Sequence, residues 1–147
     1  MAEKLTMNRS EMMSRIGSRN TKPEMVVRQG LHALGFRYRL HAKNLPGSPD
    51  IVLPKYKSAI FIHGCFWHAH EGCQNFRVPK SNTEFWKEKL ARNIERDARQ
   101  IKELEDAGWR VLVVRECATR NLSTKKLVET IAAWLHHEMQ IVQIPYK

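Results

Sequence analysis

The sequence predicts an α/β domain in which a mixed β-sheet is flanked by helices. Short apolar segments of strand length occur in the first half of the chain and again near residue 110. Segments with helical periodicity lie before, between and after them. The resulting order of helix, three strands, helix, strand and helix is typical of a sheet covered by helices. We expect a basic arm at 1–20 and one domain at 21–147, which is long enough for one hydrophobic core.

The first helix is expected over residues 21–35. Thr21 and Glu24 have the spacing of a capping box, and Pro23 suits the first helical turn. Gly35 is a typical stop signal at the end of a helix. Gly30 lies inside the same segment and speaks against the helix, because glycine lowers helix propensity.

Three strands are expected next, joined by short turns. Residues 36–40 alternate between apolar and basic side chains, as a half-buried strand does. The turn sequence LPGSP leads into the apolar segment 50–53, and a second turn leads into the apolar segment 58–64. Short turns between consecutive strands favour an antiparallel meander.

The second half of the chain contains the clearest helix, expected from Ser81 to Gly108. Its apolar residues recur every three or four positions, and Ser81 and Glu84 have capping-box spacing. Residues 109–116 are then expected as the fourth strand, and residues 123–139 as a final amphipathic helix.

The charge balance favours a nucleic-acid partner. The chain has 25 Lys and Arg against 15 Asp and Glu, a net charge of +10, and basic surfaces bind phosphates with release of counterions. A merely soluble basic protein is the alternative. No apolar run reaches the roughly 20 residues that a membrane span needs. The first residues also lack the apolar core of a signal peptide, so we expect a cytoplasmic protein without a membrane partner.

The three cysteines predict a zinc site. An odd number of cysteines without an export signal argues against a disulfide framework. Cys65, His70 and Cys73 lie close together and form half of a site on one loop. Cys117 reaches the same end of the sheet if the fourth strand packs beside residues 58–64, and a Cys3His set is a structural Zn²⁺ site. The alternative is a buried Cys117 and two free thiols.

The choice of His70 for zinc leaves His63 and His68 for acid–base chemistry. Asp50 follows a turn and opens an apolar strand, where its carboxylate can bind Mg²⁺. Asp50 and Glu24 also have plain structural readings, as a turn residue and a helix cap. Together the four residues would form a carboxylate–imidazole site on a basic surface, which suits metal-assisted phosphodiester hydrolysis.

Several segments of the chain then match a known pattern in order: MSRIGSRNTKPE, LPGSPDIV, IFIHGCFWHAH, TEFWKEKLARNIERD and GWRVLVVRECA. From Met13 to Ala133 the sequence resembles the very short patch repair endonucleases, bacterial enzymes with a restriction-endonuclease-like fold. The resemblance implies a Mg²⁺-dependent nick in double-stranded DNA, 5′ to the thymine of a T:G mismatch. Such mismatches arise when 5-methylcytosine is deaminated.

The resemblance also implies residue roles at the catalytic site. Asp50 matches the metal-binding aspartate, and Ile62, which occupies a position where threonine is expected, would contribute its main-chain carbonyl to the metal. His68 matches the histidine that activates water. His63 and Glu24 match supporting active-site residues.

Two further groups of residues receive roles from the resemblance. The zinc ligands are implied to be Cys65, His70, Cys73 and Cys117, in agreement with the spacing argument. Phe66, Trp67 and Met13 match residues that insert into the DNA base stack beside the mismatch. We expect a monomer, because a nick in one strand does not require a two-fold symmetric enzyme.

Two other functions fit the same sequence. A restriction-type or defence nuclease would use the same metal site on matched DNA. A non-catalytic, zinc-stabilised DNA-binding module would need none of Asp50, His63 and His68.

Overall fold

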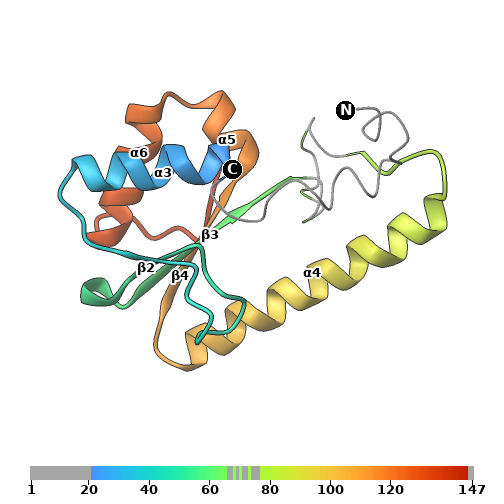
Figure 1. The fold of residues 1–147 in the computed structure, drawn as a ribbon, viewed down its shortest axis with the longest axis horizontal. Helices are drawn as coiled ribbons and strands as arrows, with labels where there is room; N and C mark the ends of the chain where they lie inside the picture. The colour runs from blue at the N-terminus through green and yellow to red at the C-terminus, as the bar shows by residue number, and fades with distance from the viewer. Residues whose placement is uncertain (1–20, 66–67, 69, 71–72, 74–76, 146–147) are drawn as a thin grey trace, which may run out of the picture.

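The computed structural model of the chain describes residues 21–65, 68, 70, 73 and 77–145. The predicted arm at 1–20 and the expected DNA-inserting residues Met13, Phe66 and Trp67 lie outside the described residues. Within the described part, a five-stranded sheet has the strand order β1-β2-β3-β4-β5. Figure 1 shows α3, α5 and α6 on one side of this sheet and the long helix α4 on the other.

The sheet is mixed, as predicted. β1 pairs antiparallel with β2 and β2 with β3, whereas β4 pairs parallel with β3 and β5 parallel with β4. The antiparallel meander is therefore confirmed. None of the described helices is long and apolar enough to cross a membrane. The elements in chain order are α3 (Lys22–Ala33), β1 (Arg39–Leu40), β2 (Ile51–Leu53), a 3₁₀ turn (Pro54–Tyr56), β3 (Ser58–His63), α4 (Thr83–Asp106), β4 (Arg110–Arg115), α5 (Glu116–Asn121), α6 (Thr124–Leu135) and β5 (Gln143–Ile144).

The two faces of the sheet support two apolar cores. Side chains alternate along a strand, so Ile60 of β3 and Leu112 of β4 pack in the core that contains α3 and α6. Phe61 and Val113 are in the second core, which contains Leu104 of α4. β3 and β4 are thus buried on both faces, which explains why each forms a continuous apolar run in the sequence.

Gly30 lies where α3 meets α6. A Cβ atom built on Gly30 would be 2.3 Å from Cγ2 of Val128 and 3.3 Å from its Cβ. The glycine that spoke against the helix is therefore needed for the close approach of the two helices. The predicted stops are confirmed, because Gly35 and Gly108 both follow their helices with φ of +91°.

The predicted order of elements lacked α5 and β5. α5 spans six residues and β5 two, too few for either to establish a periodic pattern. The last helix, expected over 123–139, is α6 and ends at Leu135. Ser123 caps it by accepting a hydrogen bond from the main-chain N–H of Lys126 at 3.1 Å.

The strand expected at 36–40 is reduced to Arg39–Leu40. Phe36 is buried in the core beside α3. The hydroxyl of Tyr38 donates to the main-chain carbonyl of Arg28 at 2.9 Å. Phe36 and Tyr38 therefore pack against α3, and pairing with β2 begins only at Arg39.

Neither capping box forms as predicted. Thr21 Oγ1 accepts from the N–H of Glu24 at 3.4 Å, but the Glu24 carboxylate bonds Arg28 and His41 instead of the main chain of Thr21. The second box, at Ser81, is wrong. α4 begins at Thr83, and its N-cap Asn82 has a φ of 56°, with no side-chain capping bond. Asparagine tolerates this left-handed conformation better than most residues.

We expect Gly30→Ala to lower the free energy of unfolding by about 1–3 kcal/mol, because the added methyl group overpacks the contact with Val128. The intrinsic helix preference of alanine, about 1 kcal/mol over glycine, acts in the opposite direction. Urea denaturation measures the net change.

The matched test is the same substitution in a Val128→Ala background, which removes Cγ2 and Cγ1, the two atoms nearest to the added Cβ at 2.3 and 3.2 Å. There, Gly30→Ala should be neutral or stabilising. Stabilisation by Gly30→Ala in the unmodified protein would contradict the packing argument.

Candidate catalytic and metal-binding site

Ligand-capable side chains gather where β3 and β4 end and β2 begins. His63 and Arg115 form the last registered pair of the parallel strands β3 and β4. Asp50 directly precedes Ile51, the first residue of β2, which runs antiparallel to β3. Within each of three groups, the described residues bring one ligand atom apiece to within 4.8 Å of one another. The groups are Cys65, His70, Cys73 and Cys117; His63, His68 and Asp97; and Glu24, His41 and Asp50.

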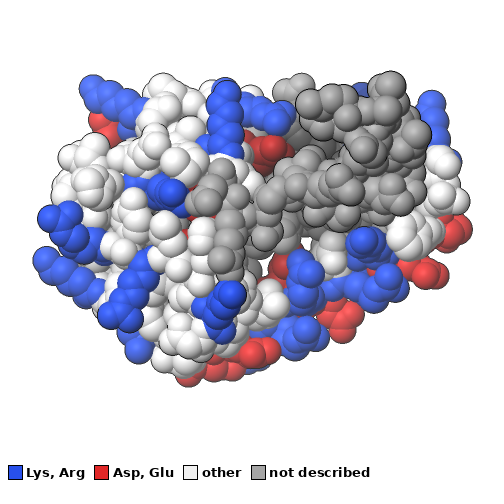
Figure 2. All heavy atoms as spheres, in the orientation of Figure 1, with Lys and Arg blue, Asp and Glu red and all other residues white. Residues whose placement is uncertain are grey.

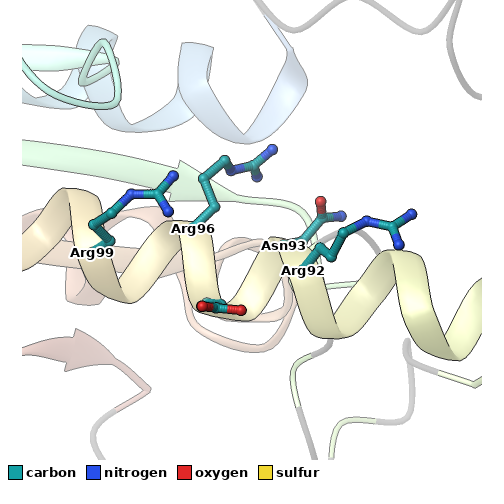
Figure 3. A pocket seen from close by; sticks show the side chains of 5 residues that line it. Arg92, Asn93, Arg96 and Arg99 are labelled. Atoms are coloured by element: carbon teal, nitrogen blue, oxygen red, sulfur yellow. The ribbon is translucent and has the colours of Figure 1, made fainter.

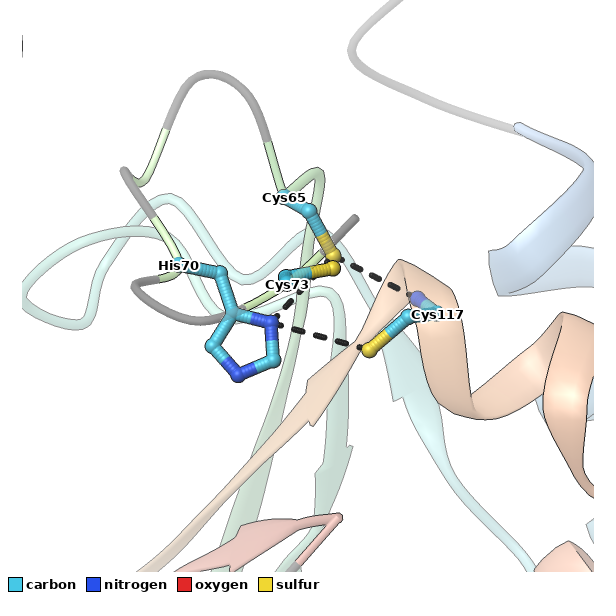
Figure 4. Close-up of side chains that lie close together, drawn as sticks. All are labelled: Cys65, His70, Cys73 and Cys117. Carbon is cyan, nitrogen blue, oxygen red and sulfur yellow. Dashed lines mark hydrogen bonds between the residues drawn. The ribbon is translucent and has the colours of Figure 1, made fainter. Parts of the chain in front are cut away.

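The four residues expected for zinc lie together (Figure 4). Nδ1 of His70 is 3.6 Å from Sγ of Cys65 and 3.6 Å from Sγ of Cys117. A tetrahedral Zn²⁺ ion with bonds of ~2.3 Å to sulfur and ~2.0–2.1 Å to nitrogen separates these atoms by about 3.5–3.6 Å. The donor set and its spacing therefore fit zinc.

The protonation and hydrogen bonding of the three cysteines also bear on metal binding. All three cysteines are free of disulfides. Burial, with the neighbouring thiols, raises the pKa of Cys65 to about 12, so this thiol is a poor nucleophile without a metal. The main-chain N–H of Cys117 donates to Sγ of Cys65 at 3.4 Å. β4 pairs with β3, as the prediction required, and Cys117 follows it in the first turn of α5.

The second group joins β3, the following loop and α4. The imidazole rings of His63 and His68 stack with centroids 3.7 Å apart and planes 2° from parallel. Nδ1 of His68 is hydrogen-bonded to Oδ2 of Asp97, and Arg96 donates to the other oxygen of Asp97 at 3.1 Å. Since a carboxylate only accepts hydrogen bonds, Nδ1 of His68 carries the proton and its Nε2 is left as a base.

The pKa shifts in this group have identifiable causes. Burial alone would raise the pKa of Asp97, but the hydrogen bond and charge of His68, with His63 and Arg96, bring it below its usual value. Burial, assisted by the charge of His68, lowers the pKa of His63 well below its usual value. His63 is therefore neutral near pH 7, and its Nδ1 has no hydrogen-bond partner among the described residues.

The third group joins α3 to the turn before β2. The carboxylate of Glu24 is 1% exposed, accepts from Arg28 at 2.8 Å and lies 3.0 Å from Nε2 of His41. Oδ2 of Asp50 accepts from the main-chain N–H of Ile62 at 2.7 Å. The main chain of Ile62 is therefore adjacent to the Asp50 carboxylate, and the group offers the hard oxygen donors that Mg²⁺ prefers.

Asp50 has a strongly perturbed pKa. Burial raises it to about 6, and the nearby Glu24 adds to the shift, while the hydrogen bond from Ile62 and the charge of His41 partly oppose it. A carboxyl group with a perturbed pKa beside a second acidic residue is typical of functional sites.

The structure divides the expected catalytic residues between two groups. Glu24 lies with Asp50, as expected, but His63 and His68 lie with Asp97. Sequence reasoning missed Asp97, a carboxylate seven residues from both Leu90 and Leu104 and therefore on the buried side of α4. A charged residue inside that apolar stripe was an available signal. Sequence reasoning also missed His41, although a histidine just ahead of the turn that leads to Asp50 was an available signal.

Basic side chains continue from this site along α4. Arg92, Arg96 and Arg99 project from the same side of the helix and, with Asn93 and Glu95, line a shallow hollow (Figure 3). On the face of the molecule seen in Figure 2, Lys and Arg are spread more widely than Asp and Glu over the described residues. The arrangement suits a phosphate backbone.

Comparison with known proteins gives consistent matches. The sequence profile of the family described as DNA mismatch endonuclease Vsr matches residues 3–75. The type II nicking enzyme V.NmeAIP of Neisseria meningitidis is 52% identical over 116 residues, covering 79% of this chain and 82% of that enzyme. The DNA mismatch endonuclease Vsr of Escherichia coli is 43% identical over 139 residues, covering 92% and 88%. The type II nicking enzyme V.XorIIP of Xanthomonas oryzae is 45% identical over 123 residues, covering 83% and 90%.

We expect the buried Asp50 carboxyl to make the free energy of unfolding fall as pH rises. The folded protein holds the proton up to about pH 6, whereas the unfolded chain releases it near the ordinary aspartate pKa of 3.8. Asp50→Asn removes this penalty, so the variant should be more stable by up to about 3 kcal/mol at about pH 8 and gain nothing near about pH 4.

Urea denaturation without divalent metal at both pH values measures this difference. Asp106→Asn is the control, since Asp106 is an exposed aspartate at the end of α4. The same stability gain at both pH values in Asp50→Asn would show that burial does not raise the pKa of Asp50.

Proposed function

Since the chain belongs to the Vsr family of DNA mismatch endonucleases, we propose that it nicks double-stranded DNA 5′ to the thymine of a T:G mismatch, with Mg²⁺ as cofactor. Family membership makes the chain an endonuclease that hydrolyses phosphodiester bonds in DNA. The expectation of an enzyme is therefore confirmed over that of a non-catalytic binding module. The mixed sheet agrees with the restriction-endonuclease-like fold that the family implies.

One observation supports this proposal above the others: carboxylates and an oriented histidine lie at the same end of the sheet. Asp50 directly precedes β2, and His63 is the last residue of the adjacent strand β3. Each is joined by a partner from a helix, Glu24 from α3 and Asp97 from α4. Metal-assisted hydrolysis needs this combination of a hard-cation site and a base.

The Asp50 carboxylate and the main-chain carbonyl of Ile62 would hold Mg²⁺, with Glu24 beside them. The bound cation would supply charge stabilisation at the phosphate under attack. The hydrogen bond from Ile62 N–H orients the Asp50 carboxylate. Because this contact uses only the main chain of residue 62, isoleucine can stand where threonine was expected.

His68 would accept the proton of the attacking water through Nε2. Its Nδ1 is engaged by Asp97, which fixes the tautomer and the ring orientation, as the aspartate of a catalytic triad does. His63 supports the ring from one face by stacking. Burial keeps His63 uncharged, so it does not repel the proton that His68 would gain.

Cys65, His70, Cys73 and Cys117 would bind a structural Zn²⁺ ion. The ion would hold the loop that carries His68 against the first turn of α5, since Cys65 and His70 flank His68 in the sequence. A structural site of this kind contributes directly to folding.

Contacts with DNA would come from several parts of the chain. Phe66, Trp67 and Met13 are proposed to insert beside the mismatch, where the stack opens at lower cost than in matched DNA. Arg92, Arg96 and Arg99 would contact phosphates. We propose that the enzyme acts as a monomer in the bacterial cytoplasm, where its DNA substrate is located.

We expect the protein with Mg²⁺ to nick a duplex that contains one T:G mismatch. Asp50→Ala should lower the nicking rate by about 100-fold or more, because the cation contributes several kcal/mol to the transition state. Gel analysis of a strand-labelled duplex measures the rate and the position of the nick. DNA binding by the variant should remain.

Asp106→Ala is the matched control for this substitution and should retain full activity, because Asp106 is exposed and pairs only with Lys102 among the described residues. Asp97→Asn should slow the nick while leaving the preference for the mismatch unchanged. Equal cleavage of the matched duplex would instead favour a restriction-type or defence nuclease. Full activity of Asp50→Ala would remove Asp50 from the mechanism.

We expect freshly purified protein to contain about one zinc ion per chain, and Cys117→Ser to lose the ion together with part of the folding stability. Metal analysis by mass spectrometry and urea denaturation measure the two effects. Ala118→Ser is the control, because it places the same hydroxyl at a neighbouring buried position without removing a ligand. Retention of zinc by Cys117→Ser would contradict the assignment.

A further inference from the structure

His41 contacts both acidic residues of the proposed metal site. Its side chain reaches Glu24, with Nε2 3.0 Å from each of the two carboxylate oxygens. Its main-chain N–H donates to the carbonyl oxygen of Asp50 at 3.0 Å. This second bond extends the β1–β2 ladder by one residue beyond the pair of Leu40 and Ile51. A single residue therefore contacts the side chain of one carboxylate residue and the main chain of the other.

The backbone of His41 is held in a conformation that suits this contact. Its φ is +50°, in the left-handed region, where histidine occurs more often than most residues. The following residue, Ala42, donates to the carbonyl of Pro49 at 3.2 Å. Two main-chain hydrogen bonds, from His41 to Asp50 and from Ala42 to Pro49, thus close the turn that precedes β2. The His41 ring points from this closed turn toward Glu24 of α3.

Glu24 needs such a partner because its carboxylate is almost fully buried. Arg28 donates to one oxygen, Oε2, at 2.8 Å from the next turn of α3. A carboxylate accepts and does not donate, so the imidazole is the donor in its contact with Glu24. Arg28 alone would leave Oε1 with no described hydrogen-bond partner, and two adjacent carboxylates repel each other unless donors surround them.

From this arrangement we propose that His41 is a positioning residue for the divalent cation, which fixes the Glu24 carboxylate beside Asp50 before the cation binds. The inference rests on the proposed metal site at Asp50. His41 would act from outside the ligand set, as residues that orient metal ligands do, and such partners typically contribute about 10–100-fold to metal affinity.

The experiment is a titration of the zinc-loaded protein with Mn²⁺, a paramagnetic substitute for Mg²⁺, followed by electron paramagnetic resonance. His41→Leu removes the donor, whereas the amide nitrogen of His41→Gln reaches about as far as Nε2 and can donate to Glu24. Both substitutions lose the preference of histidine for the left-handed backbone, so the comparison between them isolates the hydrogen bond. His32→Gln, at an exposed position in the last turn of α3, is the unrelated histidine control.

We expect His41→Leu to bind Mn²⁺ about 10–100-fold more weakly, and His41→Gln to remain within about 3-fold of the unmodified protein. In nicking assays, His41→Leu should need more Mg²⁺ for half-maximal rate and recover most of its maximal rate at saturating Mg²⁺. DNA affinity measured in chelator should not change, although a general loss of structure would lower it.

Unchanged Mn²⁺ affinity in His41→Leu, with binding abolished in Asp50→Asn, would overturn the role of His41 and leave the proposed function intact. Unchanged Mn²⁺ binding in Asp50→Asn would instead remove the metal site of the proposed function itself. An equal loss in His41→Gln and His41→Leu would also overturn the inference, because the loss would then not depend on the hydrogen bond to Glu24.

Discussion

The parallel pairing of β3 with β4 is the constraint on which the rest of the structure depends. Six residue pairs, from Ser58 opposite Arg110 to His63 opposite Arg115, make both strands end at the same level. The loop after β3 and the helix after β4 therefore start side by side, which brings Cys65 next to Cys117. The antiparallel β2 starts near the same level and adds Asp50. Three groups of polar side chains thus share one edge of an otherwise apolar sheet.

Burial at this edge has opposite effects on acids and bases. It raises the pKa of Asp50 to about 6 and lowers that of His63, so burial shifts both groups toward their uncharged forms. Asp97 is the exception, because contact with His68 outweighs its burial and keeps it charged. This end of the sheet therefore provides one carboxylate that orients a histidine, and one carboxyl group whose raised pKa a nearby cation would lower.

Elements with a long, regular pattern could be predicted from the sequence, whereas the two-residue β5 and the six-residue α5 could not, because their existence depends on neighbours in space. The same distinction applies to the site. Turn chemistry and strand ends indicated Asp50 and His63, and ligand spacing indicated the cysteines. Asp97 interrupts the apolar stripe of α4 between Leu90 and Leu104, which marks it as unusual, but only the structure shows that its partner is His68. The turn after His41 was a signal for this residue, but its contact with Glu24 also depends on a left-handed backbone and on the packing of α3.

The contact between Cys65 and Cys117 joins positions 52 residues apart, and the whole of α4 lies between them. Holding the two ends of a flexible segment together has an entropic cost that depends only weakly on its length, because this cost rises with the logarithm of the number of residues. Doubling such a segment costs only about 0.6 kcal/mol. Residues inserted before Thr83, outside the helix, would therefore cost little, whereas an insertion within α4 would rotate Asp97 or Leu104 away from the sheet.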